Sequence, residues 1–212
     1  MVLAAGDDDR PTGSGKDECL MDKKNDRLML LHLVMMGLMV ILSGISAWII
    51  FSGHIPEGYE VFSEIQKKAS LVVGFSHTAN VFALICGIAY ILKGATKSAA
   101  GLYKAFLLLV LLGLALRLAG KLVYPGFDLV AGLMIGSLLM LLILTFVKDL
   151  GKTKTWSVFY ILLALDLVTA ILMYDSREAL SSIASGLTRL VLDGSIGLAI
   201  RAKYMDKAAR GK

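Results

Sequence analysis

The chain has 212 residues, of which 57% are hydrophobic and 18% charged, and its mean hydropathy is +0.72. Soluble domains average about 45–50% apolar and about 25% charged residues, so this composition excludes an ordinary soluble domain. Because a membrane-spanning helix uses roughly 20 apolar residues, a chain of this length holds about six such helices. We therefore expect no separate soluble catalytic domain within these residues.

The formal net charge is +5 and the pI about 9.2, values that in a soluble protein suggest nucleic-acid binding. Here the basic residues instead lie in short runs between apolar stretches, a pattern typical of the cytoplasmic loops of membrane proteins. We therefore expect the lipid bilayer as a partner and no nucleic acid. The two cysteines, Cys19 and Cys86, have neither the number nor the spacing of a disulfide or zinc framework, which predicts free thiols.

The N-terminal segment, residues 1–27, is polar and rich in both acidic and basic side chains. It lacks the apolar core of a signal peptide, and its composition is typical of disorder. We therefore predict a disordered cytoplasmic tail at residues 1–27, a transmembrane domain at residues 28–200 and a basic cytoplasmic tail at residues 201–212.

Six apolar stretches follow in chain order, and each is long enough to cross the hydrocarbon core as a helix. The predicted fold class is therefore an all-α integral membrane protein, a bundle of six transmembrane helices joined by short loops. A Leu-Ala-Leu-x-Leu pattern shared by residues 114–118 and 163–167 suggests in addition a parallel helical-hairpin repeat. The predicted spans are residues 28–51, 69–92, 105–123, 129–147, 156–174 and 179–200.

Basic residues are distributed unequally between the two sides of the predicted bundle. Because Lys and Arg collect in cytoplasmic loops, this asymmetry predicts a multi-pass membrane protein with both termini on the cytoplasmic side. The connections opposite the termini hold only Lys67, Lys68 and Arg177. The connections after the second and fourth spans and the C-terminus hold Lys93, Lys97, Lys104, Lys148, Lys152, Lys154, Arg201, Lys203, Lys207, Arg210 and Lys212.

Several polar or ionisable side chains interrupt the apolar stretches. An ionisable group within hydrocarbon costs about 2.5–3.5 kcal/mol on insertion scales, so its presence usually indicates a partner, a water-filled cavity or a function. The helical rise, counted from the cytoplasmic ends, places Asn80, Arg117, Asp166 and Arg189 near the bilayer midplane. The full set of candidate site residues is His77, Asn80, Arg117, Lys121, Asp166, Arg189 and Asp193.

Charge pairing divides these candidates into two groups. Asp166 and Arg189 fall at similar depth on consecutive antiparallel helices and can pair directly, and Asp193 lies four residues from Arg189 on one helix face. Arg117 and Lys121 are then positive groups without a carboxylate, which is unfavourable in a dry core. We therefore predict a ligand-binding site for an anionic small molecule, bound by Arg117 and Lys121 and shaped by the other candidates. The alternative is a buried charge network that orders the helices or meets a partner subunit.

Enzyme chemistry fits the sequence poorly, and we expect no catalytic residues, no cofactor and no metal. The chain has only three histidines, at depths that cannot supply paired axial ligands to one haem. Asp166 and Asp193 superficially offer the two carboxylates of an intramembrane aspartyl protease. Arg189, one turn from Asp193, is expected to keep both carboxylates ionised and so to remove the shared proton that this chemistry needs.

These observations lead us to expect a small membrane transport component, either a substrate-binding or an ion-coupled carrier subunit, with its polar site near the midplane. In size and topology the chain is similar to the substrate-binding membrane subunits of vitamin uptake systems, an analogy of architecture alone. The alternative is a non-catalytic structural or assembly subunit of a larger membrane complex. The expected partners are a small anionic ligand and either other membrane subunits or further copies of the chain.

Overall fold

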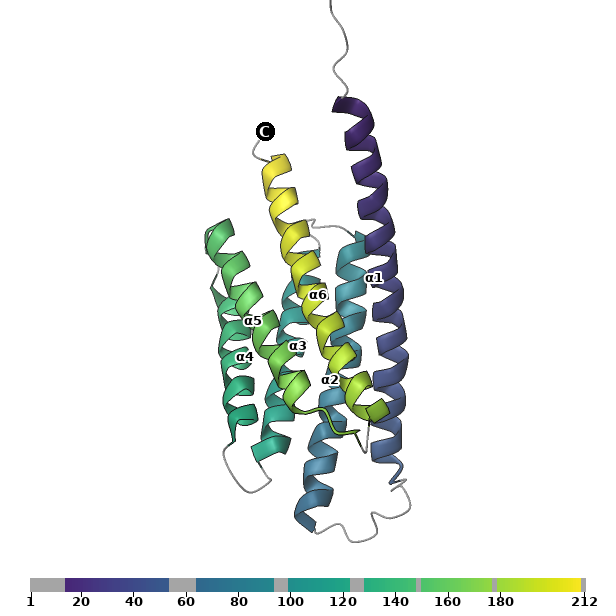
Figure 1. Cartoon of the computed structure of the whole chain (residues 1–212), viewed down its shortest axis with the longest axis vertical. Helices are drawn as coiled ribbons and strands as arrows, with labels where there is room; N and C mark the ends of the chain where they lie inside the picture. The colour runs from purple at the N-terminus through teal and green to yellow at the C-terminus, as the bar shows by residue number, and fades with distance from the viewer. Residues whose placement is uncertain are drawn as a thin grey trace, which may run out of the picture.

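Helices account for all the regular secondary structure of the described residues (Figure 1). The computed structural model describes residues 14–53, 64–93, 99–122, 128–147, 150–176 and 179–210. The helices are α1 (Ser14–Phe51), α2 (Glu64–Lys93), α3 (Ala100–Leu122), α4 (Leu129–Phe146), α5 (Lys152–Leu172) and α6 (Ala179–Arg210).

Each helix contains one apolar segment long enough to cross a membrane, so the prediction of six long apolar helices is confirmed. Large apolar side chains are exposed on all six helices, which suits a surface that meets lipid rather than water. The candidate spans are Arg27–Phe51, Lys67–Lys93, Ala100–Leu122, Leu129–Phe146, Lys152–Leu172 and Ala179–Tyr204.

Two helices extend further than we expected. α1 begins at Ser14, within the segment predicted to be disordered, and α6 continues to Arg210, through most of the predicted basic tail. High charge content favoured the prediction of disorder, but Lys, Arg and Glu are good helix formers and no proline interrupts either extension. The remaining tail residues, 1–13 and 211–212, lie outside the described residues.

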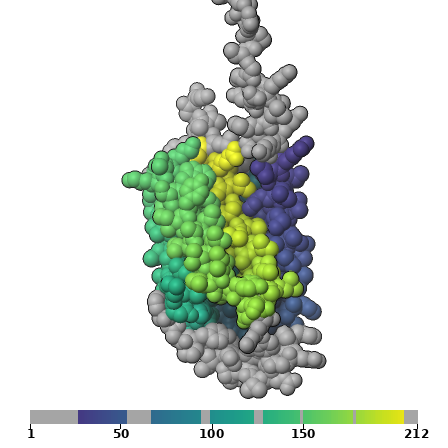
Figure 2. Space-filling view, in the orientation of Figure 1, coloured from purple at the N-terminus to yellow at the C-terminus, as the bar shows by residue number. Residues whose placement is uncertain are grey.

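The helices run alternately in opposite directions around a common core (Figure 1). Helices that are consecutive in sequence pack against one another, and α6 also contacts α1 and α2. Figure 2 shows α6 between α5 and α1 on one face of the molecule. In the apolar stretch of α6, 50% of the residues are buried, against 17% in that of α1. α6 is therefore the central helix. Both ends of the described chain lie at one end of the bundle, which we call the termini end, and the opposite end is the loop end (Figure 1).

Local chemistry fixes two helix boundaries at the loop end. α1 is followed by Gly53, whose φ of 68° is a left-handed conformation that glycine adopts without strain. α4 is preceded by Asp128, whose carboxylate accepts a hydrogen bond of 2.9 Å from the backbone N–H of Ala131. Gly53 thus ends α1, and Asp128 begins α4.

The half of the bundle nearer the termini end is tightly packed around α6. Phe159 and Ile196 are buried there. A Cβ on Gly197 would lie 2.7 Å from Phe159 Cζ, and a Cβ on Gly194 would lie 2.7 Å from His32 Cε1. α6 therefore approaches α5 and α1 as closely as glycine permits. We call this region, around these five residues, the closed half.

Candidate functional site

A cavity of about 820 Å³ lies in the other half of the bundle, between α1, α2, α3 and α6. It is open to the surface rather than enclosed, and its volume falls within the roughly 300–1,000 Å³ typical of ligand pockets. We call this region the open half. The polar side chains that line the cavity are Ser43, Ser46, Ser76, His77, Asn80, Arg117, Lys121, Ser181, Ser185 and Thr188.

Arg117 is a charged group on the wall of this cavity. It lies on α3, and its Nη2 donates a hydrogen bond of 2.6 Å to Ser185 Oγ on α6. No carboxylate oxygen of the described residues lies within 4.0 Å of its guanidinium nitrogens. A guanidinium carries five N–H donors. Arg117 therefore presents a positive charge, and donors beyond the one that Ser185 uses, to the cavity.

Lys121, which we expected to bind an anion together with Arg117, forms an ion pair instead. Its Nζ lies 2.7 Å from Asp128 Oδ2. The hydrogen bond from Lys121, assisted by the backbone N–H of Ala131, lowers the pKa of the exposed Asp128 carboxyl below its usual value of 3.8. Lys121 thus lines the cavity with its charge already compensated.

Arg189 on α6 organises a second group of charges. Its Nε donates a hydrogen bond to Asp166 Oδ2 on α5, so the direct pair considered from the sequence is present. Its Nη2 lies 3.6 Å from Asp193 Oδ1, one helical turn further along α6. The side chains of Arg189, Asp166 and Asp193 are 11%, 3% and 0% exposed. One buried positive charge is therefore shared unequally between two buried carboxylates.

A second cavity, of about 240 Å³, connects the two groups of charges. It lies between α3, α5 and α6, and Arg117, Asp166 and Arg189 all line it. Arg117 and Ser185 also line the larger cavity. Arg117 therefore stands at the boundary between the larger cavity and the Arg189 cluster.

Polar groups that lack hydrogen-bond partners also line the larger cavity. Among the described residues, Ser43 Oγ and His77 Nδ1 are buried without such a partner. Asn80 lies beside His77 in the lining of the cavity. A Cβ on Gly113 of α3 would lie 2.5 Å from Asn80 Oδ1. Because buried polar groups are normally hydrogen-bonded, we expect a ligand or water in the cavity to form hydrogen bonds with Ser43 and His77.

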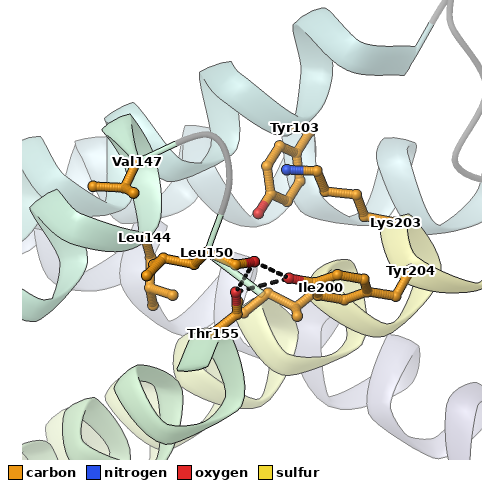
Figure 3. A pocket seen from close by; sticks show the side chains of 8 residues that line it. All are labelled: Tyr103, Leu144, Val147, Leu150, Thr155, Ile200, Lys203 and Tyr204. Atoms are coloured by element: carbon orange, nitrogen blue, oxygen red, sulfur yellow. Dashed lines mark hydrogen bonds between the residues drawn. The ribbon is translucent and has the colours of Figure 1, made fainter. Parts of the chain in front are cut away.

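A hydrogen-bonded cluster, which we call the seal, ties α5 and the residues before it to α6 at the termini end (Figure 3). Tyr204 Oη donates a hydrogen bond of 3.0 Å to the carbonyl oxygen of Leu150 and lies 2.7 Å from Thr155 Oγ1. Lys203 Nζ lies 5.3 Å from the ring centroid of Tyr103, within the range of a cation–π contact. The space among these side chains is only about 20 Å³, which holds no organic ligand.

The structure separates the predicted site residues into three places. The larger cavity is lined by His77, Asn80, Arg117 and Lys121, and the smaller one by Arg117, Asp166 and Arg189, with Asp193 buried beyond Arg189. Sequence reasoning missed the hydroxyl groups, because a neutral Ser or Thr in an apolar helix attracts little notice. One signal was available, since the spacing of Ser181, Ser185 and Thr188 places three hydroxyls on one face of α6.

Comparison with known proteins supplies no relative from which a function could be transferred. No family model, no curated protein and no solved structure matches this chain. The function proposed for it therefore rests on the chemistry of these cavities.

Proposed function

We propose that this chain is a membrane transport component that binds a small organic anion in the 820 Å³ cavity of the open half. The observation that carries the proposal is Arg117, which lines both cavities and has no carboxylate of the described residues within 4.0 Å. Holding a guanidinium that lacks a directly paired carboxylate inside a membrane protein costs several kcal/mol. An anion that pairs with Arg117 offsets that cost.

The lining of the cavity narrows the class of anion. A guanidinium binds carboxylate, sulfonate or phosphate oxygens through parallel N–H donors. Apolar side chains from α1 and α6 cover another part of the wall, among them Leu42, Ile49, Ile183 and Leu187. An acidic group with an apolar portion fits both surfaces, so the proposed ligand is a small amphipathic anion rather than a purely polar one.

The two ends of the bundle suit a carrier that is open on one side. The cavity belongs to the loop end, whereas at the termini end the cluster of Tyr204, Leu150 and Thr155 leaves only about 20 Å³ among its side chains. With the termini in the cytoplasm, as the distribution of basic residues predicts, the anion enters from the side opposite the cytoplasm. Release on the other side then requires the closed half to open, which a partner protein or an ion gradient has to drive.

A substitution that fills the cavity tests the site without altering a charged residue. Ala184 lines the larger cavity, and Ala184→Leu should abolish anion binding because the added atoms occupy the ligand's space. Ala164→Leu is the matched control, since Ala164 is exposed on the outer face of α5 and its enlargement leaves the cavity unchanged. Equal anion binding by wild type and Ala184→Leu would place any anion site elsewhere.

The rival function is an assembly subunit of a larger complex. Native mass spectrometry of the protein, extracted gently from its own membrane, distinguishes the two functions. A monomer or small homo-oligomer that retains a discrete anionic molecule supports the carrier. A defined complex with other proteins, and no small molecule on this chain, contradicts it and favours the assembly role.

A further inference from the structure

Asp193 is a buried carboxylate that the proposed anion site does not use. Its side chain is 0% exposed. Among the described residues, no N–H or hydroxyl group donates a hydrogen bond to either of its oxygens, and the carboxyl of Asp166 lies close enough to interact with it. Its nearest positive charge is Arg189 Nη2 at 3.6 Å, and the Nε of the same guanidinium already bonds Asp166. Arg189 therefore pairs directly with Asp166 and only at a longer distance with Asp193.

A bare carboxylate in this position is costly, and the simplest way to remove its charge is a proton. Ionised groups lose several kcal/mol of hydration on burial unless they are paired and hydrogen-bonded. Metal cations need several oxygen, nitrogen or sulfur ligands. The described part of the chain holds no group of three His, Cys, Asp or Glu side chains able to supply them. The chemistry at Asp193 thus favours a proton over a metal ion.

The balance of buried charge links this proton to the anion. Arg117 and Arg189 are offset by Asp166 and Asp193 when all four are ionised, so an anion at Arg117 leaves one uncompensated negative charge. Protonation of Asp193 restores neutrality in the same low-dielectric region. We propose that Asp193 is a proton-binding site coupled to the anion site, so that one proton is bound with each anion. This inference rests on the proposed function and supplies its coupling ion.

The groups that face this region from the neighbouring helices are few. Asp166 on α5 and Arg117 on α3 line the smaller cavity together with Arg189. His32 on α1 contacts the Gly194 position, and its Nε2 lies 3.1 Å from Ser195 Oγ. His77 on α2 lines the larger cavity. The two histidines titrate near neutral pH in their ordinary state, so His32→Asn and His77→Asn are needed as controls.

The proton site is tested first without any anion. Infrared difference spectra of the wild-type protein in nanodiscs, titrated between about pH 4 and pH 9 across the carboxyl and histidine range, should show the carbonyl band of a protonated carboxylic acid in a dry environment. Asp193→Asn should remove that band, whereas His32→Asn and His77→Asn should keep it. A set of bands unchanged by Asp193→Asn would overturn the proposal.

Coupling is tested with hexanesulfonate, an amphipathic anion whose charge is fixed over this pH range. For one coupled proton, affinity in the wild type should rise by up to about tenfold for each unit of decreasing pH. Asp193→Asn should bind with an affinity that no longer depends on pH, and the histidine variants should retain the dependence. In weakly buffered solution, at a pH where the infrared titration shows Asp193 ionised without anion, wild-type protein should take up as much as about one proton per hexanesulfonate bound.

The outcomes separate this inference from the proposed function. Hexanesulfonate binding that is independent of pH in the wild type, with no proton uptake, contradicts the proton site and leaves the anion site standing. Absence of binding at every pH, with an Asp193 band that titrates normally, contradicts the anion site and leaves the proton site standing.

Discussion

The closed and open halves of the bundle are built from the same six helices but differ in how α6 meets its neighbours. In the closed half, Gly194 and Gly197 let α6 lie directly against His32 and Phe159. In the open half, the α6 positions nearest α1 and α3 carry hydroxyls such as Ser185, and a cavity of about 820 Å³ separates the helices. Close packing thus supplies stability at one end, while the other end keeps polar groups available to a ligand.

The two partly buried arginines, Arg117 and Arg189, show the same contrast. Arg189 bonds a carboxylate of its own chain and stands near a second, whereas Arg117 bonds only a hydroxyl among the described residues. A paired charge can be structural, but a charge whose only partner is Ser185 is incompletely satisfied by the fold. The comparison therefore assigns Arg189 to stability and Arg117 to binding, and the following experiments test that division.

The largest effect is expected for Arg189→Leu. Removal of this guanidinium leaves Asp166 and Asp193 buried without a positive partner, which should destabilise the protein by about 3–5 kcal/mol. Arg117→Leu should cost at most about 1 kcal/mol, because the lost hydrogen bond to Ser185 is offset by the removal of a charge that lacks a carboxylate partner. Reversible unfolding in mixed detergent micelles measures both variants. Equal losses of stability would remove the distinction between the two arginines.

An overpacked glycine in the closed half should have the next largest effect. Gly197→Ala drives a methyl group into the buried Phe159 ring, where its Cβ would lie 2.7 Å from Cζ, and should cost about 1–3 kcal/mol. Gly44→Ala is the control, because nothing lies within 4 Å of its added Cβ. That variant should be neutral or gain up to about 1 kcal/mol of helix propensity. Thermal unfolding should show a lower Tm for Gly197→Ala and an unchanged or higher Tm for Gly44→Ala. Equal destabilisation of the two variants would refute the close approach of α6 and α5.

Tyr204→Phe probes the seal at the termini end and should have a smaller effect. Loss of the Oη group removes the hydrogen bond to Leu150 and the contact with Thr155, at a cost of about 0.5–1.5 kcal/mol. The carbonyl of Leu150 keeps a second donor, because Thr155 Oγ1 also bonds it at 3.1 Å. Tyr160→Phe is the matched control, since Tyr160 is 60% exposed. Equal stability of the Tyr204→Phe and control proteins would show that the cluster in Figure 3 does not hold the end closed.

The exposed pair between Lys121 and Asp128 should have the smallest effect, visible mainly as a pH dependence. Because the hydrogen bond from Lys121 holds the folded-state pKa of Asp128 below 3.8, the pair stabilises the fold fully above the ordinary aspartate value. That contribution disappears as pH falls through the lowered pKa. Asp128→Asn keeps a helix-capping side chain at the start of α4. The difference in Tm between wild type and Asp128→Asn should therefore vanish in acid, and a difference that grows in acid would contradict this assignment.

Much of the fold was predictable because it follows from uninterrupted apolar sequence. Each predicted span coincides with a helix, and the direct pair between Asp166 and Arg189 followed from counting helical rise. Gly132 and Gly136 form a Gly-x-x-x-Gly step, a pattern that favours close helix packing, and a Cβ on Gly136 would meet the Leu165 side chain of α5 at 3.2 Å. These features depend on local spacing and depth, which the sequence contains.

The remaining features depend on how the helices tilt and pack against one another. Lys121 pairs with Asp128 because the end of α3 and the start of α4 lie close together, a placement that apolar length and helical spacing do not fix. The cavity exists because α6 packs closely at Gly194 and Gly197 but not at Ser185. Helix tilt is set by packing against neighbours rather than by apolar length, so the cavity could not be inferred from the sequence, although the spacing of its three α6 hydroxyls is present there.

Equilibrium binding of radiolabelled hexanesulfonate to the purified protein in nanodiscs tests the central claim most directly, with empty nanodiscs to correct for uptake by lipid. Arg117→Leu should weaken binding by about tenfold or more, the loss expected when a charged hydrogen-bond donor is removed. Arg117→Lys should retain part of the affinity, because the positive charge remains. Unchanged binding by the folded Arg117→Leu protein would contradict the assignment of this arginine to an anion site.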